Sequence, residues 1–245
     1  MLLVAGGCQT TSRTASSQGS AMSTTVLGIS FLKINASGRT YPYAAYVPRD
    51  YDASKPWPLI VFLNGSGECG TDGQRQLTQG LLPAILNKPQ EWPFVVLFPQ
   101  KPDQKSAWED HSAYVLAIID AAQQTYNIDA SRVYLTGLSQ GGHGTWAIGS
   151  MYPDRFAALA PICGYGKPDE IGPKLKSMPI WAFHGAMDKV VLPEQSQKLV
   201  DAAKAAGGNV TLTLYPGVDH GSWDRAYREE NLGRWFLTHQ KPAAR

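Results

Sequence analysis

A serine in a glycine-rich segment is the residue of this sequence best placed to act as a nucleophile. Gly137-Leu138-Ser139-Gln140-Gly141 has the spacing G-x-S-x-G, between a strand-like apolar run and the glycine-rich start of a helical pattern. The two glycines permit a sharp turn that presents the hydroxyl above the strand end. We therefore expect covalent catalysis at Ser139, and the alternative is a serine that only caps a helix.

A serine hydroxyl reacts only when a base removes its proton, and the base needs an acid to orient it. An acid and a histidine follow the ends of two later strand-like runs, which gives the chain order serine, acid, histidine. Asp188 follows the first run and His220 the second. We expect Asp188 to orient His220. Asp219 is the competing acid, but adjacent side chains usually diverge.

The other four histidines fit the role of base less well. His184 lies within a strand-end turn and is expected to be a hydrogen-bonded structural residue. His143, just inside the helix after Ser139, is expected to pack or to contact the rim of the site. His111 and His239 are expected on exposed faces of helices.

Acyl transfer creates an oxyanion, so backbone N–H groups must be aimed at it in advance. The residue after the nucleophile supplies one such group, which predicts the Gln140 amide. The second comes from the loop that follows the third strand, Leu63-Asn64-Gly65-Ser66-Gly67-Glu68. We expect the Ser66 amide here, with Gly67 as the alternative.

Several strands and helices must bring these residues together. Short β-rich runs alternate with helical patterns, which predicts an α/β fold with an eight-stranded, mostly parallel sheet covered by helices on both faces. The first two runs predict an antiparallel hairpin. Between the sixth and seventh runs, residues 164–178 are too few for a helical lid. The predicted strands are 26–34, 41–47, 58–63, 94–98, 132–136, 157–162, 179–183 and 210–215, and the predicted helices are 77–86, 111–126, 141–151, 193–206 and 223–237.

Composition narrows the class of protein. The 245 residues include 22 basic and 20 acidic side chains spread along the chain, so no dense cationic surface exists to bind nucleic acid. No run of eighteen apolar residues is present, so no transmembrane segment is expected. Cysteine and histidine do not occur at metal-ligand spacing, so no metal is expected. The sequence indicates no particular oligomeric state.

The first 25 residues predict a leader or flexible tether, followed by a catalytic domain over residues 26–245. The run Val4-Ala5-Gly6-Gly7-Cys8 resembles the end of a bacterial lipoprotein signal, although it lacks the basic start of a full one. We expect export, with lipid attached at Cys8; the alternative is a cytoplasmic protein that starts at Met22. Cys69 and Cys163 remain, either as a disulfide or as two buried thiols.

These motifs together resemble one group of α/β-hydrolases. The segments around Asn64, Ser139, Asp188 and His220, with Tyr152-Pro153-Asp154-Arg155-Phe156, are similar to lidless esterases that include dienelactone hydrolases, polyhydroxybutyrate depolymerases and feruloyl esterases. The resemblance implies the α/β-hydrolase fold without a large lid, and serine-dependent ester hydrolysis without a cofactor. Ser139 departs from dienelactone hydrolases proper, which use cysteine. Asn64 departs from the His-Gly that usually opens its loop.

The expected function is that of a serine carboxylesterase acting on short-chain or aryl esters, among them feruloyl or hydroxyalkanoate esters. Trp108, Tyr165 and Trp223 follow strand ends or adjoin His220, so they are expected to flank a small or polymeric ester substrate, and the alternative for each is packing in the core. The alternatives are a serine peptidase, an acyltransferase or a binding protein without catalytic activity on the same fold.

Overall fold

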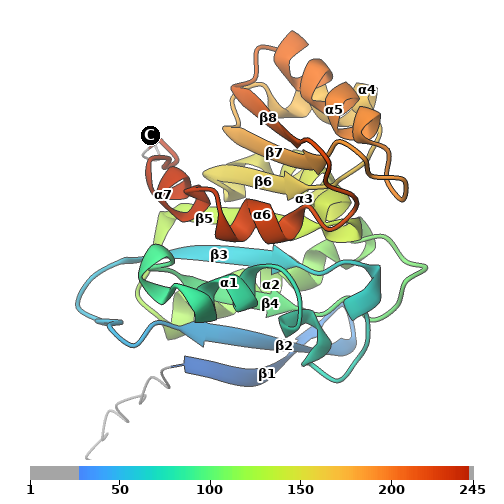
Figure 1. The fold of residues 1–245 in the computed structure, drawn as a ribbon. Helices are drawn as coiled ribbons and strands as arrows, with labels where there is room; N and C mark the ends of the chain where they lie inside the picture. Colours follow the sequence, from blue (N-terminus) through green and yellow to red (C-terminus); the bar gives the residue numbers. More distant parts are fainter. Residues whose placement is uncertain (1–27, 243–245) are drawn as a thin grey trace, which may run out of the picture.

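An eight-stranded sheet runs through the computed structural model, which describes residues 28–242 (Figure 1). The predicted leader and Cys8 lie outside the described residues. The strand order is β1-β2-β4-β3-β5-β6-β7-β8; β2 pairs antiparallel with β1 and with β4, and all other pairs are parallel. The strands are β1 (Gly28–Ala36), β2 (Arg39–Val47), β3 (Trp57–Leu63), β4 (Val95–Pro99), β5 (Ile128–Leu138), β6 (Ala158–Ile162), β7 (Ile180–Gly185) and β8 (Val210–Tyr215).

Burial explains where each strand lies in the sheet. The central strands β4 and β6 are buried at every residue, as expected for apolar runs with helices on both faces. The edge strand β1 instead alternates between half-buried and exposed residues. It joins β2 through a two-residue turn, in which Ser37 and Gly38 have φ of 48° and 75°. The predicted fold class and hairpin are therefore confirmed.

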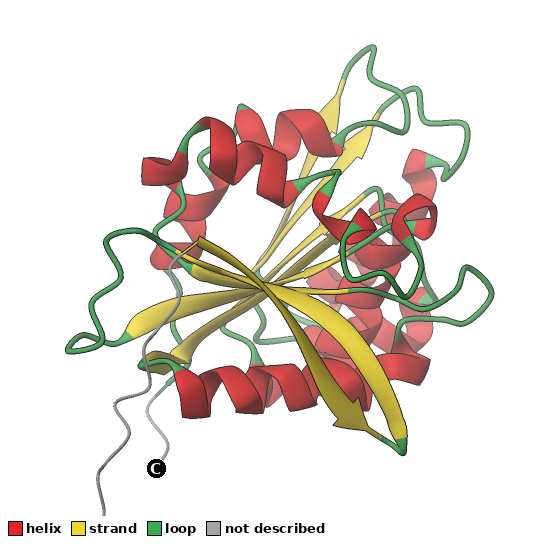
Figure 2. Ribbon diagram, turned by 90° about the horizontal axis from the view of Figure 1, so that it is seen from below, coloured by secondary structure: helices red, strands yellow, loops and turns green. Residues whose placement is uncertain are grey.

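Helices cover both faces of the sheet (Figure 2). One face packs against α2, α3, α4 and α5, whose buried residues form one apolar core with the sheet. The opposite face packs against α1, α6 and α7 and forms a second core. The helices are α1 (Leu81–Asn87), α2 (Ser112–Thr125), α3 (Gln140–Met151), α4 (Pro168–Ile171), α5 (Pro193–Ala205), α6 (Trp223–Arg228) and α7 (Leu232–Leu237), with short 3-10 turns at η1 (Ser66–Glu68), η2 (Arg75–Leu77), η3 (Pro89–Glu91), η4 (Glu109–His111), η5 (Pro153–Arg155) and η6 (Gly172–Leu175).

Two predicted helices are wrong in extent. The predicted helix 77–86 is only α1, because Gly80 with φ of 72° separates it from η2. The predicted helix 223–237 is divided into α6 and α7, because Asn231 takes non-helical angles of −80° and 44° before α7 begins. Residues 164–178 also contain α4 and η6, which bury Ile171 and Leu175 in the core.

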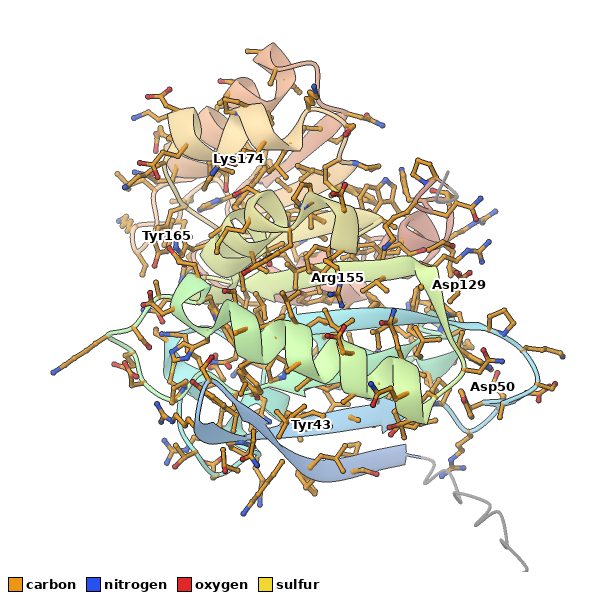
Figure 3. The ribbon with its side chains drawn as sticks, turned by 180° about the vertical axis from the view of Figure 1, so that it is seen from behind. Tyr43, Asp50, Asp129, Arg155, Tyr165 and Lys174 are labelled. Atoms are coloured by element: carbon orange, nitrogen blue, oxygen red, sulfur yellow. The ribbon has the colours of Figure 1, made fainter. Side chains whose placement is uncertain are left out.

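The chemistry-bearing segments meet at one edge of the sheet. Parallel strands β3, β5, β6, β7 and β8 all end on the same side, so the loops that follow them are neighbours. Figure 3 shows Tyr165, which follows β6, at this end of the sheet, whereas Asp129, at the start of β5, lies at the opposite end. No helix within residues 28–242 has the length and apolar character needed to cross a bilayer.

The backbone at the start of α3 lies very close to the end of β3 at this edge. A Cβ at Gly141 would lie 2.0 Å from the Leu63 carbonyl oxygen, and one at Gly137 would lie 2.5 Å from the Gly141 carbonyl oxygen. Only glycine permits these separations, which explains both glycines of the G-x-S-x-G spacing.

Gly141→Ala is expected to lower the free energy of unfolding by about 2–3 kcal/mol, because the new methyl group must push α3 away from β3. Chemical denaturation followed by circular dichroism measures the change. Gly67→Ala is the control, because nothing lies within 4 Å of a Cβ at that position. Equal stability of the two variants would contradict the close approach.

Candidate active site

Ser139 occupies a strained turn between β5 and α3. Its φ and ψ are 54° and −115°, a conformation that L residues rarely adopt. Two acceptors hold its amide: the Ile162 carbonyl oxygen at 2.9 Å and the Cys163 sulfur at 3.3 Å. Ser139 is 8% exposed, so its hydroxyl lies close to the protein surface on a fixed backbone. Strain of this kind is stored where the surrounding structure holds a reactive group in position.

His220 and Asp188 complete a line of hydrogen bonds to Ser139. His220 Nε2 lies 3.0 Å from Ser139 Oγ, and His220 Nδ1 lies 2.7 Å from Asp188 Oδ2. Asp219 accepts a hydrogen bond from the Gly221 amide instead, at 3.1 Å. The structure therefore brings together the three residues expected from the sequence, with Asp188 in the orienting position. This geometry allows His220 to take a proton from Ser139 and keep it while Asp188 balances the charge.

Asp188 is held as a carboxylate although it is only 2% exposed. Burial opposes its ionisation, but hydrogen bonds from His220 and from the Val191 and Val190 amides, both 2.9 Å from Oδ1, outweigh burial and lower the pKa of Asp188. The loop after β7 thus supplies its own donors to one carboxylate oxygen and leaves the other for His220.

His184 supports this carboxylate from within the core. It is fully buried, and its Nε2 lies 2.9 Å from the Val191 carbonyl oxygen and 3.2 Å from Asp188 Oδ2. Its Nδ1 lies 2.7 Å from the hydroxyl of Ser196. Burial lowers the pKa of His184, so it is neutral and donates from Nε2. The sequence-based expectation of a hydrogen-bonded structural histidine agrees with these contacts.

Gln140 and Ser66, whose amides are the expected oxyanion donors, both line the cleft beside the nucleophile. Gln140 is the first residue of α3, so its N–H has no partner inside the helix. Ser66 begins η1, the turn after β3, and lines the same cleft as Ser139 and Gln140. Among the hydrogen bonds of the described residues, neither amide donates to a protein acceptor. Their positions suit an oxyanion hole.

Asn64 braces the loop that carries Ser66. It is fully buried, and its Oδ1 accepts from the Lys101 amide at 3.0 Å while its Nδ2 donates to the Gly65 carbonyl oxygen. The Asn64 carbonyl oxygen accepts from Trp108 Nε1 at 3.0 Å. An asparagine side chain donates and accepts at once, which accounts for its ability to hold this loop where the family pattern has histidine.

Trp108 and His111 lie elsewhere than the sequence suggested. Trp108 was expected on the substrate rim but is 1% exposed, because its ring fills the core beside Gly144 while its N–H holds Asn64. His111 was expected on the surface but is buried between Ser106 and Tyr41, with Nε2 2.8 Å from the serine hydroxyl. The loop between β4 and α2 is therefore a support for the site.

Tyr165 and Trp223 both lie at the site. Tyr165 is half-buried and lines the cleft that contains Ser139. Trp223 packs edge-on against His220, with ring centroids 5.4 Å apart and planes at 86°. Trp223 thus limits the movement of the catalytic imidazole.

The cleft around Ser139 has a volume of about 460 Å³, and the sequence analysis missed one of its walls. Val190, Val191 and Leu192 form this wall, and two of them are largely exposed. Their only sequence signal is that they lie within four residues after Asp188. A smaller cleft of about 190 Å³ shares Gln140 and Tyr165 with the first and adds polar side chains, among them Lys105, Gln104 and His143.

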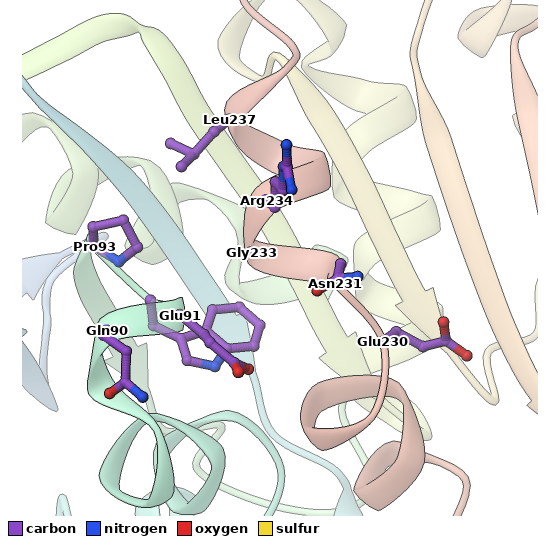
Figure 4. Close-up of a pocket in the computed structure, with 9 residues that line it drawn as sticks. Gln90, Glu91, Pro93, Glu230, Asn231, Gly233, Arg234 and Leu237 are labelled. Atoms are coloured by element: carbon purple, nitrogen blue, oxygen red, sulfur yellow. The ribbon is translucent and has the colours of Figure 1, made fainter.

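Another cleft lies away from this chemistry. It has a volume of about 230 Å³ and lies between residues 90–93 and α7 (Figure 4). Its lining includes Trp92, Glu230 and Arg234, and none of Ser139, Asp188 or His220. We therefore place the site at the carboxyl edge of the sheet.

Both cysteines within the described residues are buried free thiols. Cys163 lies beside the site: its sulfur and ligand atoms of Asp188 and His220 are all within 4.8 Å of one another. Burial raises the pKa of the Cys163 thiol to about 12, so it is protonated and packs below Ser139. Although Cys163 lies close to both residues, the His220 imidazole is hydrogen-bonded to the Asp188 carboxylate.

The sequence and fold of this chain are similar to those of known hydrolases. The model of the dienelactone hydrolase family matches residues 89–233. A bifunctional acetylxylan esterase/xylanase of Neocallimastix patriciarum is 35% identical over 42% of this chain and 16% of its own length, and feruloyl esterase B of Neurospora crassa is 30% identical over 49% and 42%. The chain thus spans less than half the length of these relatives. A thermostable esterase of known structure is 34% identical, with a TM-score of 0.79 over 87% of this chain and 63% of its own.

Asn64→Asp is expected to lower kcat about 10-fold or more while KM changes little, because a buried carboxylate repels the Gly65 carbonyl oxygen and displaces the Ser66 amide, and oxyanion contacts act mainly in the transition state. Steady-state hydrolysis of p-nitrophenyl acetate provides both constants. Asn87→Asp, an exposed position at the end of α1, controls for the added charge. A rise in KM without a fall in kcat would refute the role of Asn64 as a brace.

Proposed function

Because the chain belongs to the dienelactone hydrolase family of α/β-hydrolases, we propose that it is a serine carboxylesterase that hydrolyses short-chain or aryl esters through an acyl-enzyme. The observation that carries the proposal is the line of hydrogen bonds from Ser139 through His220 to Asp188, with distances of 3.0 Å and 2.7 Å. This line lies at the mouth of a cleft and beside two unpaired backbone amides, which are the parts that acyl transfer requires.

In the first half of the reaction, Ser139 Oγ attacks the ester carbonyl carbon while His220 Nε2 takes the hydroxyl proton. The carbonyl oxygen becomes negative and is bound by the Gln140 and Ser66 amides. His220, now an imidazolium, is stabilised by Asp188. It then gives its proton to the leaving alcohol as the carbon–oxygen bond of the ester breaks, and the acyl group stays on Ser139.

In the second half, water replaces the alcohol. His220 removes a proton from the water as it attacks the acyl carbon, and the same amides bind the second oxyanion. Collapse of this intermediate returns the proton to Ser139 Oγ and releases the carboxylic acid. In both halves of the reaction the neutral imidazole of His220 is the form that acts as the base.

The cleft supports a small apolar or aromatic substrate. Its volume of about 460 Å³ lies within the range of small-molecule sites, and Val190, Val191 and Leu192 provide an apolar wall. Tyr165 adds an aromatic surface, and Ser66 and Gln140 add polar groups to the lining of the cleft. Relatives named as acetylxylan and feruloyl esterases support the inclusion of acetyl and feruloyl esters.

Ser139→Ala is expected to abolish labelling by a fluorophosphonate and to lower hydrolysis of p-nitrophenyl acetate by about 10⁴-fold or more, because the nucleophile is lost while the oxyanion hole remains. Gel fluorescence and spectrophotometry measure the two effects. Methyl ferulate and a peptide anilide, tested on the native protein, separate an esterase from a peptidase. Cleavage of the anilide alone would overturn the proposal.

Asp188→Asn is expected to lower kcat by about 10⁴-fold, because an amide no longer holds His220 in the tautomer that accepts the serine proton. Asp219→Asn is the matched control and should retain activity, since Asp219 bonds only the Gly221 amide in the described structure. The opposite result, with Asp219→Asn inactive and Asp188→Asn active, would reassign the acid.

A further inference from the structure

A histidine one turn beyond the nucleophile makes contacts that the reaction does not use. His143 lies in the first turn of α3, and its amide donates to the Ser139 carbonyl oxygen at 2.9 Å. Its Nδ1 lies 2.9 Å from the Tyr165 carbonyl oxygen, and its Nε2 lies 3.0 and 3.1 Å from the two carboxylate oxygens of Glu109. The imidazole thus joins η4 to the loop after β6.

The hydrogen-bond acceptors around His143 favour its protonated form. A neutral imidazole has one N–H, but a carbonyl oxygen and a carboxylate face its two nitrogens, and both can only accept. Both contacts are satisfied together only by the imidazolium. Burial opposes the charge, but hydrogen bonds to Glu109 and to the Tyr165 carbonyl outweigh burial and raise the pKa of His143. The same contact lowers the pKa of Glu109.

The residue held by this imidazolium lies at the centre of the site. Tyr165 lines both the cleft of Ser139 and the smaller polar cleft beside it. Its ring stacks on the ring of His143, with centroids 4.7 Å apart and planes at 13°. A cation on one face of an aromatic ring attracts it electrostatically, so the charge strengthens the stack. Hydrogen bond and stack together position both the backbone and the ring of Tyr165, at the end of the sheet seen in Figure 3.

We propose that protonated His143, paired with Glu109, is a positioning residue that holds Tyr165 against the cleft and so sets the preference of the enzyme for esters with an aromatic group. The inference rests on the proposed esterase function and goes beyond it by naming what selects the substrate. His143 acts through Tyr165, not on the reacting atoms. The side chain of His143 is 16% exposed and that of Glu109 is 34% exposed, so the pair is partly sheltered from solvent and remains open to titration.

The contacts of His143 with Glu109 and Tyr165 weaken as the pH rises. The pKa of His143 is raised in the folded protein, so the imidazolium contacts are complete below the ordinary histidine pKa of about 6.5 and are lost as the pH rises through the higher folded pKa. The charged and titratable groups facing His143 are Glu109 from η4, Tyr165 from the loop after β6, and Lys101, whose charge opposes protonation. Burial raises the pKa of Tyr165, so its own ionisation lies above this transition.

The test compares His143→Phe, Glu109→Gln and the native enzyme on phenyl acetate, methyl benzoate and ethyl acetate, from about pH 6 to 9.5 to span histidine titration. For the native enzyme, kcat/KM for the aromatic esters relative to ethyl acetate should fall as the pH rises. In both variants KM for the aromatic esters should rise about fivefold at low pH, with kcat within about twofold, because a charge-assisted contact that only positions a binding surface is lost. The pH dependence of the ratio should disappear in His143→Phe and move to lower pH in Glu109→Gln.

The controls separate this inference from the proposed function. Glu91→Gln removes an acid from an exposed ion pair with Lys88 and should behave as the native enzyme does. His143→Phe keeps a ring for stacking but no hydrogen bonds, so a native KM and a native pH dependence in this variant would overturn the proposal. Fluorophosphonate labelling and ethyl acetate hydrolysis should persist in every variant. Their absence from the native protein would instead refute the esterase function.

Discussion

The site depends on the hydrogen bond between His220 and Asp188. A hydroxyl such as that of Ser139 becomes a nucleophile only beside a base of fixed orientation, and Asp188 provides this orientation at 2.7 Å. The carboxylate works in turn because two amides of its own loop satisfy its second oxygen, and because the buried ring of His184 supports it. A buried charge without these partners would become neutral and would lose its effect on His220.

Three histidines at one sheet edge show how environment assigns different tasks to the same side chain. His184 is fully buried, and burial outweighs the nearby Asp188 carboxylate and lowers the pKa of His184, so it is uncharged and structural. His143 faces a carboxylate and a carbonyl, which favour the imidazolium. His220 has an acid on one nitrogen and a hydroxyl on the other, the arrangement of a base that accepts and returns a proton.

The loop after β4 gives the site a support that is separate from the catalytic residues. The backbone of Lys101 and the ring of Trp108 both hold Asn64, and the Gln104 side chain donates to the Ser66 carbonyl oxygen at 3.1 Å. The fully buried ammonium of Lys101 folds this loop by donating to two carbonyl oxygens of its own segment. The loop that carries Ser66 is therefore held in place by its neighbours, as the proposed binding of an oxyanion there requires.

The sequence alone determined the fold class, the eight strands and the three residues Ser139, His220 and Asp188 that meet at the sheet edge, because each depends on local signals. Apolar runs define buried strands, glycines mark a turn too tight for a side chain, and residues that follow parallel strands must share an edge. Only the tertiary structure decided which side chains support the site. Trp108 is core and not rim, Asn231 divides the last helix, and the His143–Glu109 pair joins segments 34 residues apart, because burial and pairing depend on neighbours that are remote in the chain.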